Sequence, residues 1–128
     1  MMRSKGFLVV ASVMGGTGVA LGAFGAHGLK SSITSDMLSV FETGVRYQMY
    51  HTFALFAACW LMQRRSSKWL SYAAWFFVVG VILFSGSLYV LAMTGLRSFG
   101  LITPFGGLSF LAGWFSLAWG VLQKDVQE

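Results

Sequence analysis

The sequence predicts an all-α integral membrane protein, built as a four-helix bundle in a single domain (residues 1–128). Three observations predict this fold class. Hydrophobic residues make up 56% of the chain and charged residues only 10%, whereas a soluble domain carries charge on about a quarter of its residues. The apolar residues form four long stretches, and basic residues occupy the gaps between them. We therefore expect the excess apolar surface to face lipid.

The four apolar stretches predict helices at residues 7–26, 43–62, 69–93 and 104–122, with residue 36 as an alternative start of the second helix. Each stretch reaches the roughly 20 residues that a helix needs to cross ~30 Å of hydrocarbon. A helix also pairs its own backbone N–H and C=O groups, for which lipid offers no hydrogen-bond partners. The first stretch has a second interpretation as a cleavable signal peptide, but its length and its glycine spacing favour a retained helix.

Two shorter segments refine the helix boundaries. Residues 31–41 place Ile33, Met37, Val40 and Phe41 at helical spacing. This pattern predicts either a short interfacial amphipathic helix between the first and second helices or an extension of the second helix. Before the fourth helix, Thr103 is the predicted N-cap and Pro104 the first helical residue.

The positions of the basic residues predict the orientation in the membrane. Six of them lie before the first helix, between the second and third, or after the fourth: Arg3, Lys5, Arg64, Arg65, Lys68 and Lys124. The opposite side has three, Lys30, Arg46 and Arg97. Because cytoplasmic loops are enriched in Lys and Arg, we expect both termini in the cytoplasm.

Small residues recur at steps of three and four along the first and fourth helices. They are Ala11, Gly15, Gly18, Gly22 and Gly25 in the first helix, and Gly106, Ser109, Gly113, Ser116 and Gly120 in the fourth. In lipid, helices associate through close van der Waals contact, which small residues permit. Gly15, Gly18, Gly22, Gly106, Ser109 and Gly113 are therefore the predicted helix-packing residues.

Charged and titratable residues gather near the end of the predicted bundle that lies away from the cytoplasm. They are His27, Glu42, Arg46, His51 and Arg97. Such residues are costly in a membrane and need partners. Glu42 and Arg46 are spaced for an ion pair, and the Tyr47 hydroxyl or a water is the expected partner of His51. Two interpretations stay open: the residues stabilise helix ends, or they form a pocket for the head of a phospholipid or quinone.

The sequence disfavours several other kinds of chemistry. The basic residues form no helix face that suits nucleic acid, and Cys59 is a single cysteine in an apolar run. His27 and His51 differ in depth by about 10 Å, which disfavours a bis-histidine haem. Ser85 and Ser87 have no activating histidine or acid on their helix. We predict no metal, no cofactor and no enzymatic activity.

Four blocks of sequence resemble the YgdD-like family of small bacterial inner-membrane proteins, which has eukaryotic relatives. They are LGAFGAHGL (21–29), FETGVRYQMYHT (41–52), LFSGSLYVLA (83–92) and ITPFGGLSFLAGW (102–114). The blocks occur in order and span nearly the whole chain. The resemblance implies a multi-pass inner-membrane protein of unknown function, and it assigns no catalytic or ligand-binding residue.

Two function hypotheses follow. The first is a structural or accessory membrane protein that assembles with itself or with other membrane proteins through its small-residue helix faces. The alternative is a lipid- or quinone-binding protein, or a facilitator of small-molecule passage, that uses the polar cluster. In either case the lipid bilayer is the surrounding medium.

Overall fold

The computed structural model describes residues 4–124, and its regular structure in this range consists of helices. Helix α1 (Ser4–Phe24) continues into a π-helical segment, η1 (Gly25–Leu29), and is followed by α2 (Ser35–Arg64). Helix α3 (Lys68–Gly80), π-segment η2 (Val81–Ser85) and α4 (Gly86–Thr94) form one rod, because the junction residues keep helical backbone angles. A 3₁₀ turn, η3 (Arg97–Leu101), leads into α5 (Thr103–Leu122).

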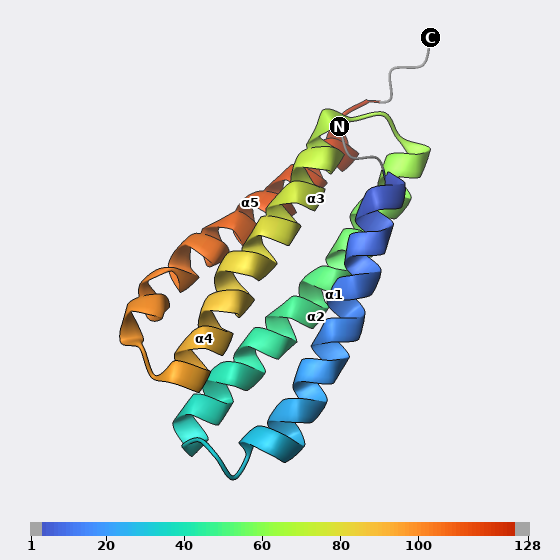
Figure 1. Ribbon diagram of the computed structural model, residues 1–128. Helices are drawn as coiled ribbons and strands as arrows, with labels where there is room; N and C mark the ends of the chain where they lie inside the picture. Colours follow the sequence, from blue (N-terminus) through green and yellow to red (C-terminus); the bar gives the residue numbers. More distant parts are fainter. Residues whose placement is uncertain (1–3, 125–128) are drawn as a thin grey trace.

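Helices α2 and α3–α4 occupy the middle of the molecule, and α1 and α5 lie at opposite edges (Figure 1). Helix α1 packs along α2, while α5 packs along α3 and η2. The start of α1, the α2–α3 connection and the end of α5 lie at one end of the molecule. At this end Arg65 Nη2 donates to the Gln123 carbonyl at 3.1 Å. Segments η1 and η3 lie at the opposite end, called the η1/η3 end below.

The core lies where α1, α2 and α3 meet, and it extends to α5. Its largest fully buried side chains include Phe7, Leu55 and Phe77. Alanines of α2 and α3 surround them, so these helices approach closely. A smaller cluster of Leu29, Phe41 and Ala92 closes the η1/η3 end. Apolar side chains also cover the outer surface, which suits a protein surrounded by lipid.

Within the described range, three helical segments are long and apolar enough to cross a membrane: Ser4–Leu29, Lys68–Thr94 and Arg97–Leu122. Helix α2 is the longest helix, with 30 residues. It is less apolar because it carries Asp36, Glu42, Arg46 and several neutral polar residues. Three of the four expected spans therefore meet this criterion.

The structure differs from the sequence-based expectations at two helix starts. Residues 35–41 are the first turns of α2 and not a separate interfacial helix, since Thr34 caps α2 by accepting from Met37 N at 3.2 Å. The prediction of Thr103 as an N-cap is wrong. Thr103 is already helical, because η3 and Ile102 supply the preceding turn, and its hydroxyl lies 2.6 Å from Ser87 Oγ.

Candidate functional site

Gln48 is the centre of a buried hydrogen-bond network that joins three helices. Its Nε2 donates to the Met14 carbonyl at 2.8 Å and to Thr17 Oγ1 at 3.0 Å, both on α1. Its Oε1 accepts from the Tyr89 hydroxyl of α4 at 2.7 Å. Gln48 was not among the predicted site residues, which are all charged or titratable. A buried amide in an apolar helix also needs hydrogen-bond partners, so the position of Gln48 in an apolar stretch of the sequence could have indicated this network.

His51 lies on another face of α2 and is held from both sides. Its Nδ1 donates to the Tyr47 carbonyl at 2.7 Å, and its Nε2 accepts from Trp114 Nε1 of α5 at 3.1 Å. The imidazole stacks on Phe110 with ring centroids 3.5 Å apart. The expected partner, the Tyr47 hydroxyl, is therefore replaced by the Tyr47 carbonyl and by an indole 63 residues away. Both contacts fit the neutral imidazole, with its proton on Nδ1.

A groove of about 560 Å³ runs between α2 and α5, next to η2. Its floor contains His51 and Phe110, each 4% exposed. Its rim includes Leu108 and Leu111, which are 62% and 67% exposed. The remaining lining residues are Tyr47, Phe84, Pro104, Gly107 and Trp114. This lining is almost entirely apolar, and the groove has the size of a small-molecule site.

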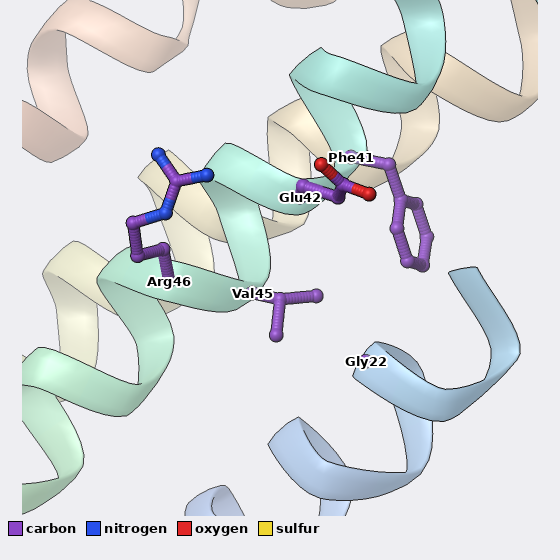
Figure 2. Close-up of a pocket in the computed structure, with 5 residues that line it drawn as sticks. All are labelled: Gly22, Phe41, Glu42, Val45 and Arg46. Atoms are coloured by element: carbon purple, nitrogen blue, oxygen red, sulfur yellow. The ribbon is translucent and has the colours of Figure 1, made fainter. Parts of the chain in front are cut away.

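A smaller cavity of about 270 Å³ lies between α1 and α2 and contains Glu42 and Arg46 (Figure 2). Gly22, Phe41 and Val45 form its apolar part. Among the described residues, Glu42 and Arg46 form no ion pair with each other, contrary to the expectation from their spacing. In Figure 2 the guanidinium extends to one side, away from the carboxylate. Both charges are therefore available to other groups.

The five residues of the expected polar cluster do not share one cavity. Arg97 lines a third cavity of about 540 Å³ together with Asp36, at the η1/η3 end. His27 is exposed on η1. Arg46 and His51 separate because five residues turn a helix by about 140° beyond one full turn. Arg46 and His51 are therefore close along the axis of α2 but point to different sides of the helix.

The small residues of α1 and α5 face other helices of the same chain. An added Cβ at Gly15 or Gly22 would lie 3.4 Å from Thr52 or Val45 of α2, and Gly18 is buried against Met49. On the other side of the molecule, Gly106 abuts Phe84 and Gly113 abuts Phe77. Ser109 Oγ donates to the Phe76 carbonyl at 2.8 Å. These faces are occupied within the chain.

Other polar groups also find partners inside the chain. Ser85 Oγ donates to the Gly44 carbonyl at 2.7 Å, and Ser87 Oγ donates to the Phe84 carbonyl at 2.9 Å. Residues 4–124 contain no group of three His, Cys, Asp or Glu side chains placed to hold a metal ion. Both ring nitrogens of His51 are engaged, so it is not arranged as a haem ligand.

Comparisons with known proteins give a consistent family. The family described as "Protein of unknown function (DUF423)" matches residues 21–107. The inner membrane protein YgdD of Escherichia coli K12, named UPF0382, is 43% identical over 122 residues, which are 95% of this chain and 93% of the relative. The UPF0382 membrane protein YwdK of Bacillus subtilis is 40% identical over 114 residues, covering 88% and 93%. A UPF0382 membrane protein of Haemophilus influenzae is 45% identical over 121 residues, covering 93% and 94%. No solved structure matches the chain.

Proposed function

The chain belongs to the DUF423 family of membrane proteins of unknown function, and we propose that it binds the apolar chain of a membrane amphiphile in the groove between α2 and α5. The ligand class is a lipid or a long-tailed quinone. The observation that carries the proposal is the apolar groove of about 560 Å³ whose floor is the stacked pair of His51 and Phe110.

The groove suits a chain-like ligand for two reasons. Its lining residues on α5 run from Pro104 to Trp114, ten residues along the helix, so it extends for about 15 Å. Lipid tails are as apolar as the lining, so preference for one ligand must come from shape and from a few polar contacts. The exposed phenol of Tyr47 supplies one such group.

The internal packing of the small residues favours ligand binding over the accessory role. That role was inferred from the glycine faces of α1 and α5, and these faces contact α2, α3 and η2 within the chain. Assembly with other proteins would have to use a different surface. The groove, in contrast, is open to the surroundings along its exposed rim of Leu108 and Leu111.

The proposal includes a topology of four crossings in a bacterial inner membrane, with both termini in the cytoplasm. Helix α2 has 30 residues, or about 45 Å, and its polar core groups Gln48 and His51 have partners on neighbouring helices. The relative in Escherichia coli is named an inner membrane protein. Cysteines introduced at Arg64 and Arg97 should react with a membrane-impermeant maleimide from opposite sides. Labelling of both from one side would contradict this topology.

Filling the groove tests the binding function. Gly107 lines the groove, and an added Cβ would meet only Phe84 Cδ2, at 3.9 Å. Gly107→Leu should therefore occupy the groove without disturbing the packing of α5. The probe is a phosphatidylglycerol with a diazirine at the end of one acyl chain, incorporated into nanodiscs. We expect crosslinking to peptides of α5 that falls severalfold in Gly107→Leu.

Gly16→Leu is the matched control. Gly16 is an exposed helical glycine of α1, and an added Cβ would meet nothing within 4 Å. This variant adds the same side chain to a surface without a groove, so α5 labelling should stay at the level of the unmodified protein. Equal labelling in all three proteins would refute binding in the groove.

A further inference from the structure

The cavity between α1 and α2 combines two opposite charges with an apolar wall. Arg46 and Glu42 line it together, four residues apart on the same face of α2. The wall consists of Phe41, which is fully buried, Val45, and the backbone at Gly22. A pocket with one cation and one anion is complementary to a ligand that carries both charges next to an apolar part.

The two charges do not neutralise each other. Glutamate and arginine at this spacing commonly pair on a helix, but here they form no ion pair, and among the described residues neither has another charged partner. Figure 2 shows the guanidinium directed away from the carboxylate, and both residues line the cavity. A ligand can therefore contact both groups without first breaking an internal salt bridge.

The order of the two charges along α2 determines which way round a zwitterionic ligand would bind. Glu42 lies one helical turn nearer to the η1/η3 end than Arg46, which is about 6 Å along the helix axis. Arg46 is therefore deeper relative to that end, and Glu42 is closer to the surface. In an aminophospholipid the phosphate is bonded on the tail side and the ammonium at the tip, so the phosphate would meet the deeper cation.

From this arrangement we infer that the Glu42–Arg46 cavity is a headgroup site for a zwitterionic aminophospholipid, with Arg46 contacting the phosphate and Glu42 contacting the ammonium. The apolar wall with Val45 would contact the ethylene carbons of the headgroup, and the tail would continue past Arg46, away from the η1/η3 end. Glu42 disfavours a purely anionic headgroup by like-charge repulsion, which sets the preference between phospholipids. This site is separate from the α2–α5 groove and does not depend on it.

Native mass spectrometry of the full chain, released from nanodiscs, tests the inference with three lipids that share the same acyl chains. They are phosphatidylethanolamine, phosphatidylglycerol and diacylglycerol. We expect the unmodified protein to retain phosphatidylethanolamine about two- to fivefold better than phosphatidylglycerol, the range for a partly solvated charge contact. Diacylglycerol should be retained least, because it lacks the phosphate.

Two variants separate the two contacts. Glu42→Gln should abolish the preference for phosphatidylethanolamine over phosphatidylglycerol, because the ammonium loses its partner and the repulsion disappears. Arg46→Gln should bring both phospholipids close to diacylglycerol, while Arg46→Lys keeps a cation and should retain most of the binding. Lys30→Gln is the control, since Lys30 is an exposed cation next to η1 that lines neither this cavity, nor the Asp36–Arg97 cavity, nor the groove.

Circular dichroism melting curves confirm that each variant is folded, which is expected because Glu42, Arg46 and Lys30 are exposed. The inference is overturned if the unmodified protein does not distinguish the two phospholipids. It is also overturned if Glu42→Gln keeps the original preference. Neither result would affect the groove, whose test uses acyl-chain labelling and the Gly107→Leu variant.

Discussion

The α1–α2 interface and the interface of α5 with α3 and η2 both contain rows of glycine, but they are built differently. Along α1, an added Cβ at Gly15 or Gly22 would remain 3.4 Å from its nearest neighbour on α2. Along α5, an added Cβ would lie 2.7 Å from Phe84 Cα at Gly106 and 2.7 Å from the Phe77 ring at Gly113. The first interface has space left at these two glycines, although Gly18 between them is packed against the flexible Met49 side chain, and the second has no space at Gly106 and Gly113.

Side-chain hydrogen bonds between helices are more numerous at the α1–α2 interface than between α3 and α5. The Gln48 network joins α2 to Met14 and Thr17 of α1, and continues to Tyr89 of α4. Between α3 and α5 the glycines pack against rings and backbone, with the Ser109–Phe76 hydrogen bond beside them. Because lipid provides no hydrophobic drive between helices, each interface needs another source of stability. The α1–α2 interface adds two hydrogen bonds from Gln48 to its apolar packing, whereas the α5 interface relies on closer packing of its glycines.

The largest effect should follow from Gly106→Ala. Its methyl group would collide with the backbone of Phe84, which cannot rotate away as a side chain can. We expect α5 to be displaced from η2 and the free energy of unfolding to fall by about 3 kcal/mol, the upper part of the range for overpacking. Unfolding in mixed micelles with increasing sodium dodecyl sulfate, followed by circular dichroism, measures this change.

The neighbouring Gly107→Ala is the control for that variant. Its methyl group would have ordinary space, so the free energy of unfolding should stay the same or rise by up to ~1 kcal/mol from improved helix propensity. Equal destabilisation by both alanines would mean that glycine flexibility, and not the contact with Phe84, matters in α5.

An intermediate effect is expected from Gln48→Met, which keeps the length of the side chain but removes the network. Interhelical hydrogen bonds in membranes contribute on average about 0.6 kcal/mol each. Gln48 makes three such contacts, so we expect a loss of about 1–2 kcal/mol. The same unfolding measurement applies.

A double-mutant cycle with Tyr89→Phe sharpens this result. Tyr89→Phe removes only the hydroxyl that donates to Gln48 Oε1, and it should cost about 0.6 kcal/mol. In the Gln48→Met background the same change should cost almost nothing, because the acceptor is already gone. Full additivity of the two changes would contradict a direct contribution of this hydrogen bond.

The smallest effect is expected at Gly15 and Gly22 of α1. Gly15→Ala and Gly22→Ala would each bring a methyl group into ordinary contact with α2. We expect changes within about 0.5 kcal/mol, because improved helix propensity offsets slight crowding. If either variant were as destabilising as Gly106→Ala, the two interfaces would not differ as described.

The candidate site was only partly predictable from the sequence. Glu42 and Arg46 attracted attention because charges in a membrane helix are costly, and the structure places them in one cavity. The groove could not be foreseen, because Trp114 meets His51 across 63 residues of sequence. The same holds for Gln48, whose partners lie 31 to 41 residues away.

The amino-acid sequence was enough to predict a helical chain suited to lipid, since length and apolarity alone decide whether a segment can satisfy its backbone hydrogen bonds in hydrocarbon. It also determined which residues are expensive to bury. Which helix faces meet became clear from the packed helices, because a shift of one residue moves a side chain by about 100° around the helix. That rotation directs Gln48 toward α1 and α4, His51 toward α5, and the two charges into a separate cavity.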